Sequence, residues 1–172
     1  TPGVPPAESI QAELAACEAL VAASRIAEAE ERLERCESRL APRAEPGSWG
    51  EFLRIRGAVH ERSTRPAADH DFAQSAIVFD LLGERYHAAL SNLALGRLAI
   101  KAGNRPAAAR YLDQAGGIFA ALGAERDLKE VDAARTALNE APLAPPAVSA
   151  ADADEAVVRR LVEAAILPEL LA

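Results

Sequence analysis

The sequence predicts an all-α protein in which helix hairpins of about 40 residues repeat along the chain. Two observations support this fold class. The first is composition: the chain is rich in the helix formers alanine, leucine, glutamate and arginine, and aromatic residues make up only 4% of it, which favours helices over strands. The second is an internal repeat that appears when the sequence is shifted by 40 positions against itself. Because alanine-rich faces let backbones approach, we expect closely spaced helices.

The repeat is clearest between residues 65–83 and 105–123. Each copy carries proline in its first turn, where the missing N–H costs nothing, and ends on glycine, which commonly follows a helix C-terminus. Apolar residues recur three and four positions apart between these two signals, as on one face of a helix. A fainter copy runs from Arg25 to Cys36. The identities are Arg65/Arg105, Pro66/Pro106, Ala67/Ala107, Ala68/Ala108, Gln74/Gln114, Phe79/Phe119, Leu82/Leu122 and Gly83/Gly123.

A second kind of helix is predicted before each copy, over residues 7–23, 48–62 and 84–102. The last of these stops at Gly103-Asn104, which is a turn signal. Short connections require neighbouring helices to run antiparallel. The chain is therefore expected to form three hairpins, followed by one more helix at 125–139. The hairpins are expected at residues 8–40, 48–83 and 84–123.

The spacing of small and bulky residues in these hairpins resembles the tetratricopeptide repeat. In the third hairpin the small Gly96 precedes the small Ala108 by twelve positions, and the bulky Leu112 follows. The full sets are Gly96, Ala108, Leu112, Ala115; Gly57, Ala68, Phe72, Ser75; and Cys17, Ala29, Leu33, Cys36. The resemblance covers residues 8–140. It implies a right-handed superhelix of stacked hairpins, an α-α solenoid, in which residues 125–139 form the capping helix.

The sequence departs from the usual pattern of that family in three respects. Its period exceeds the family's usual length of about 34 residues. Gly83 and Gly123 stand where proline usually closes the second helix, and His60 and Ala99 stand where an aromatic residue is usual. Longer repeats of this type are similar to those of large bacterial regulators and signalling proteins. Abundant arginine beside only two lysines also suggests bacterial coding.

Both ends of the sequence suggest a part of a longer protein. Methionine is absent, and the chain stops within the apolar run Leu170-Leu171-Ala172. We expect residues 1–7 to be disordered and the Pro- and Ala-rich residues 141–150 to form a linker. Residues 151–172 are expected to form a helix that leads to a missing downstream domain.

Charge and hydropathy exclude two classes of partner. The formal net charge is -7 and the sequence pI is about 5.1, whereas nucleic-acid binding favours a basic surface. No apolar run reaches the roughly 18 residues of a membrane-spanning helix, and the N-terminus lacks a signal-peptide pattern. We therefore expect a cytoplasmic protein that binds neither nucleic acid nor membrane through this segment.

No motif predicts catalysis, a cofactor or a metal site. Asp69-His70-Asp71 collects ligand-type residues, but consecutive residues on a helix point in different directions, so we expect a solvated helix face. Cys17 and Cys36 stand where the repeat requires small residues, so we expect packed free thiols. Without a convergent nucleophile and base, the sequence predicts a protein that is not an enzyme and needs no cofactor.

The tetratricopeptide resemblance implies a concave face lined by the first helix of each hairpin, where helical-repeat proteins commonly bind partners. Four cations fall on this face, namely Arg54, Arg62, Arg97 and Lys101. Together on one groove they would attract an acidic peptide or a carboxylate. The alternative is that these are ordinary solvated charges, neutralised in part by Glu51 and Glu61. The expected partner-binding residues are Glu18, Arg54, Arg62, Leu93, Arg97 and Lys101.

These observations predict an interaction, scaffold or sensory module of a larger bacterial signalling or transcriptional regulator. The module would bind a peptide or a neighbouring domain on its concave face. The alternative function is self-association into a homodimer, through the exposed face or through the helix expected after residue 150.

Overall fold

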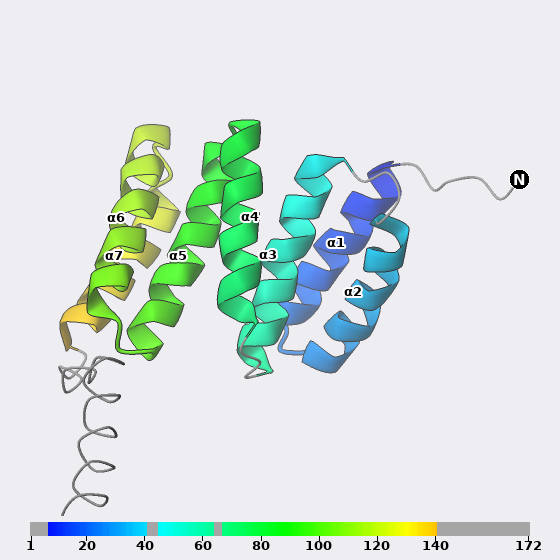
Figure 1. Cartoon of the computed structure of the whole chain (residues 1–172), viewed down its shortest axis with the longest axis horizontal. Coiled ribbons are helices and arrows are strands. Elements are labelled where there is room, and N and C mark those ends of the chain that lie inside the picture. Colours follow the sequence, from blue (N-terminus) through cyan, green and yellow to red (C-terminus); the bar gives the residue numbers. More distant parts are fainter. Residues whose placement is uncertain (1–6, 41–44, 64–66, 141–172) are drawn as a thin grey trace, which may run out of the picture. The chain divides into compact units, whose positions relative to one another are not determined.

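The computed structural model describes residues 7–40, 45–63 and 67–140, and within these ranges its only regular secondary structure is α-helix (Figure 1). The predicted all-α class is therefore confirmed for this part of the chain. The seven helices described are α1 (Ala7–Ala22), α2 (Ile26–Leu40), α3 (Pro46–Arg62), α4 (Ala68–Leu82), α5 (Arg85–Lys101), α6 (Arg105–Leu122) and α7 (Glu125–Glu140).

The chain divides into two compact units, Thr1–Ala141 and Pro142–Ala172, and all seven helices belong to the first. The predicted linker at 141–150 and the predicted helix at 151–172 lie outside the described residues, as do residues 1–6 of the expected N-terminal disordered segment.

Helix boundaries follow the glycine and proline signals of the sequence. Gly83 and Gly123 lie just after α4 and α6 and adopt left-handed φ angles of 73° and 67°, which glycine reaches without a steric cost. Helix α6 begins with Pro106 in its first turn, and the side chain of Asn104 accepts a hydrogen bond from the Ala107 N–H at 3.2 Å. These local signals make the helix ends predictable from sequence.

Helices that follow one another in the chain pack together, and α1 also contacts α3 while α5 contacts α7. Small residues mark the closest approaches. A Cβ atom on Gly57 would lie 3.0 Å from the Phe72 ring, and one on Gly96 would lie 2.8 Å from Cδ2 of Leu112. The small and bulky residues of the repeat pattern therefore lie against each other in α3/α4 and α5/α6.

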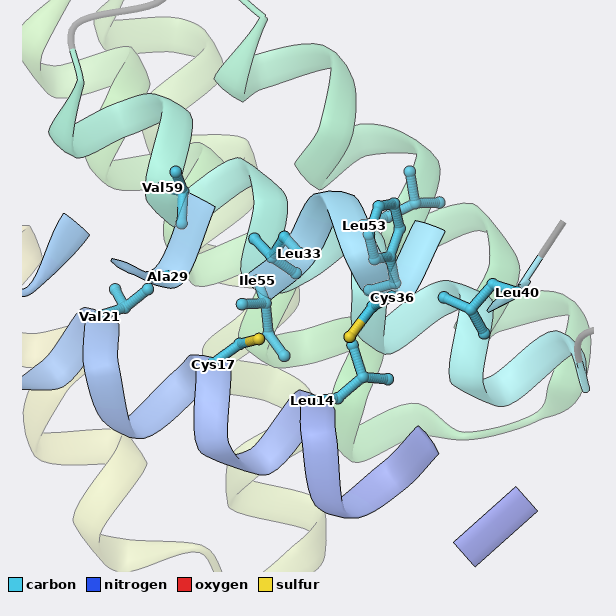
Figure 2. Close-up of a cluster of buried hydrophobic side chains, with 11 residues drawn as sticks. Leu14, Cys17, Val21, Ala29, Leu33, Cys36, Leu40, Leu53, Ile55 and Val59 are labelled. Carbon is cyan, nitrogen blue, oxygen red and sulfur yellow. The ribbon is translucent and has the colours of Figure 1, made fainter. Parts of the chain in front are cut away.

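The first hairpin, α1 and α2, shares a hydrophobic core with α3. Cys17 and Cys36 point into this cluster from α1 and α2 (Figure 2). Both are buried and neither forms a disulfide, as the sequence predicts. Burial raises the pKa of the Cys17 thiol to about 12, with the neighbouring Cys36 as the next cause, and burial also raises the pKa of Cys36. Both thiols are therefore protonated packing groups near neutral pH.

Candidate functional site

Most of the predicted concave-face cations are engaged in ion pairs between helices. Arg54 on α3 lies 2.8 Å from Glu18 on α1, with its side chain 16% exposed. Lys101 on α5 lies 2.5 Å from Glu61 on α3. These pairs connect the first helices of successive hairpins, so the charges compensate one another across the face.

The same pattern continues toward α7, where Arg97 of α5 lies 2.5 Å from Glu130. Arg62 donates a hydrogen bond of 3.4 Å to the Ser24 hydroxyl. Three of the four expected cations, all except Arg62, are therefore paired with carboxylates, which matches the alternative of neutralisation. Glu61 was foreseen as a neutralising residue, whereas the roles of Glu18 and Glu130 depend on how neighbouring helices are rotated.

Leu93 requires a correction. It was expected to contact a partner, but its side chain is 5% exposed and packs in the hydrophobic core with Ala89 and Leu112. Its position on α5 turns it toward α6 and α7, so it stabilises the fold instead of lining a surface.

The expectation of a solvated face at Asp69-His70-Asp71 is wrong for Asp71. Its side chain is 2% exposed and its Oδ2 lies 2.6 Å from Nδ1 of His60. Its Oδ1 accepts hydrogen bonds from Nη2 and Nε of Arg56 at 2.7 and 3.1 Å. Both partners lie on α3. This cluster ties α3 to α4: Arg56 compensates the charge of the buried carboxylate, and both carboxylate oxygens have a polar partner.

Two further properties of the described residues bear on the expected chemistry. No group of three or more His, Cys, Asp and Glu side chains within the described ranges is arranged to hold a metal ion. None of the helices described has the length and apolar character needed to cross a membrane.

A surface feature that sequence reasoning missed lies between α4 and α6. Helix α5 packs against both, whereas α4 and α6 do not pack extensively against each other (Figure 1). The gap contains two hollows, of about 400 and 420 Å³. Leu95 of α5 and Tyr111 of α6 line both hollows, so the hollows adjoin. We call this feature the α4–α6 groove.

The walls of the α4–α6 groove are mainly apolar. Leu95 and Leu98 of α5 line its floor, and small alanines line much of its sides. Ile77 of α4 remains 59% exposed at one wall, opposite Ile118 of α6. One turn after Ile77, Leu81 is 83% exposed. Large exposed apolar side chains that gather at a groove mark an interaction surface more often than scattered ones do.

The groove forms because the second helices of the hairpins carry small residues where they face each other. Ala68, Ala73 and Ala76 of α4 and Ala107 of α6 are too short to fill the space above α5. A sequence signal exists in Ile77, which lies off the core-facing line of Phe72, Ser75 and Phe79. One apolar residue off the core-facing line is weak evidence for a binding surface. Only the structure, in which Ile77 lines the same hollow as Tyr111 and Ile118, identifies it as part of a groove.

Charges at the α4–α6 groove are acidic. The charged residues that line its hollows are Asp69 and Asp80 of α4. Within the described part of the chain, neither carboxylate has an ion-pair or hydrogen-bond partner, in contrast to Glu18, Glu61 and Glu130. On α6, the Arg110 guanidinium lies over the Tyr111 ring, 4.8 Å from its centroid. The groove therefore combines apolar walls with uncompensated carboxylates on one rim.

Comparisons with protein-family models, with curated proteins and with solved structures give no match to this chain.

Proposed function

We propose that this protein is a non-enzymatic interaction module that holds a segment of another protein in the α4–α6 groove. The observation that carries the proposal is an open apolar groove with a large exposed side chain, Ile77, at its wall. Covering such a surface removes apolar area from water, at about 25 cal/mol per Å². The concave face is a weaker candidate because its cations Arg54, Arg97 and Lys101 are already paired.

The proposal includes the architecture and context suggested by the sequence. We assign the seven helices to a tetratricopeptide-like superhelix with α7 as its capping helix. The close Gly57–Phe72 and Gly96–Leu112 contacts and the α1–α3 and α5–α7 packing support this assignment. In this view the module belongs to a larger bacterial signalling or transcriptional regulator and works in the cytoplasm.

A selection experiment tests the binding function. The whole chain would be screened against a displayed library of helical peptides, and selected peptides would be measured against Ile77→Gln and Leu82→Gln. Both changes replace an exposed aliphatic residue of α4 with a neutral helix former. Ile77 lines the groove, whereas Leu82 lines a separate hollow near Glu45 and His87.

We expect peptides whose affinity falls by about tenfold with Ile77→Gln, equivalent to about 1.4 kcal/mol, and stays within about twofold with Leu82→Gln. Circular dichroism would check that both variants stay folded. Failure to select any peptide, or selection only of peptides indifferent to Ile77→Gln, would contradict the proposal.

Self-association through exposed apolar residues of α4 and α6 is the second candidate. It is favoured by the exposure of Leu81, Ile77 and Leu122, at 83%, 59% and 49%. Light scattering on the whole chain at two concentrations distinguishes the functions. A dimer that Leu81→Gln dissociates would support self-association, whereas a monomer at both concentrations would remove it.

A further inference from the structure

We infer that the α4–α6 groove selects a helical segment that is apolar along its length and carries a basic residue near each end. This inference rests on the proposed binding function and adds the chemistry of the partner. Its basis is the placement of Asp69 and Asp80, one lining each of the two hollows.

The two carboxylates lie on one side of α4. Asp69 is in its first turn and Asp80 is near its end, eleven positions later in the sequence. Eleven residues make about three turns of an α-helix, so such residues share a face, and they span about 16 Å. Since both line the groove, they place negative charge at two points along it, separated by apolar wall.

An apolar segment that covers the groove would take both carboxylates partly out of water. Burying an unpaired charge is costly, whereas a cation placed opposite recovers the loss. Neither Asp69 nor Asp80 has a partner within the described residues to supply that cation. The occupant must therefore supply one near each end to bind well.

The middle of the groove has a different charge preference. Tyr111 lies where the two hollows adjoin, and Arg110 stacks over its ring from the α6 side. A cation at the centre of the occupant would approach this guanidinium and would lie away from both Asp69 and Asp80. The charge pattern is therefore basic at the ends and apolar or acidic in the middle.

A second copy of the chain does not match this pattern. Two copies meeting through this face would bring the acidic rims of both α4 helices together, and the whole chain carries a formal charge of -7. Like charges brought close in an interface disfavour association. A partner of opposite charge at both ends is favoured by the same electrostatics.

A helical occupant fits the shape of the groove. Its walls are two helices, α4 and α6, with α5 as the floor between them and small side chains along much of both walls. An amphipathic helix commonly binds such a surface through residues three and four positions apart. Arginines eleven positions apart on that helix would then reach Asp69 and Asp80 from one face.

Three synthetic peptides of equal length would test the inference, each fluorescein-labelled and helix-stabilised with the same Ala/Leu face. The first carries arginines eleven positions apart, the second carries glutamates at those positions, and the third carries both arginines in the middle. Binding to the whole chain would be measured by fluorescence anisotropy at low and physiological salt.

We expect the end-arginine peptide to bind at least about tenfold more tightly than the other two. The double variant Asp69→Asn/Asp80→Asn should remove most of this difference. The matched control Glu34→Gln/Glu125→Gln removes two exposed carboxylates that do not line the α4–α6 groove, and it should leave the difference unchanged.

The outcomes separate the two proposals. If the peptides bind equally well and Ile77→Gln weakens all of them, the groove binds segments but the charge rule is wrong. If the preference for end arginines survives Asp69→Asn/Asp80→Asn, these two carboxylates are not the groups that select the arginines. If no peptide binds in a way that depends on Ile77, both the charge rule and the binding function of the groove are overturned.

Discussion

His60 on α3 and Asp71 on α4 meet across their hairpin with Nδ1 and Oδ2 2.6 Å apart. Asp71 is buried, and its other oxygen accepts two hydrogen bonds from Arg56, which also pairs with Glu37 of α2. One buried carboxylate thus connects α3 and α4, and through Arg56 it reaches α2. Removing one partner of such a cluster leaves the others uncompensated, which costs more than the net contribution of the intact cluster.

Asp71→Ala is expected to lower the free energy of unfolding by about 2–4 kcal/mol. Arg56 and His60 would keep their desolvation without their carboxylate partner. Urea denaturation measures the change. Asp69→Ala is the matched control two positions away, because Asp69 is exposed and unpaired within the described residues. A near-neutral Asp71→Ala would mean that the cluster adds nothing to stability.

Cys17 should make stability fall in alkaline solution. Its pKa rises from 9.0 in an unperturbed thiol to about 12 in the fold. Above pH 9 the unfolded chain therefore loses this proton while the folded chain keeps it, so the free energy of unfolding decreases as pH rises from 9 toward 12. Denaturation of the protein and of Cys17→Ala across this range measures the difference in slope. Equal slopes for the two proteins would contradict a raised pKa of Cys17 in the folded state.

Glycines in α5 and α6 should respond oppositely to alanine. A Cβ on Gly96 would lie 2.8 Å from Cδ2 of the fully buried Leu112, whereas one on Gly117 would have no atom within 4 Å. We expect Gly117→Ala to stabilise by about 0.5–1 kcal/mol, the helix propensity difference. Gly96→Ala should destabilise by about 1 kcal/mol, because overpacking exceeds that gain. Thermal or urea unfolding checks both, and stabilisation by Gly96→Ala would refute the close helix contact.

The Arg97–Glu130 pair between α5 and α7 should contribute little. Its side chains are 43% and 55% exposed, and exposed ion pairs contribute roughly 0–1 kcal/mol. A double-mutant cycle with Arg97→Ala and Glu130→Ala is expected to give a coupling of about 0.5 kcal/mol that shrinks in high salt. A coupling above about 2 kcal/mol would show that these charges are structurally essential.

Much of the helical architecture was predictable from the sequence because its signals are local. The periodic apolar residues of α4 and α6, the left-handed Gly83 and Gly123, and Pro106 in the first turn of α6 each act within a few residues of the chain. The repeat pattern also marks Gly57 and Gly96 as small positions and Phe72 and Leu112 as bulky ones, whereas the contacts of Gly57 with Phe72 and of Gly96 with Leu112 come from the structure.

The candidate site was less predictable. The concave-face hypothesis took Arg54, Arg97 and Lys101 as partner-binding cations, although each of them pairs with a carboxylate on a neighbouring helix. It placed Leu93 on a surface, although that side chain is in the core. Both errors concern which way a helix is turned, and one residue rotates a side chain by about 100° around the helix axis.

The sequence by itself determined the all-α class, the helix ends and the positions at which small and bulky residues recur in the hairpins. Only the tertiary structure decided the burial of Asp71, the pairing of charges between successive hairpins, and the α4–α6 groove. The physical reason is the distance along the chain over which each feature is set. Periodicity and capping depend on neighbours in the chain, whereas a groove depends on how far apart two helices lie when both pack on a third, and Ala68, Ala73 and Ala107 leave that distance unfilled.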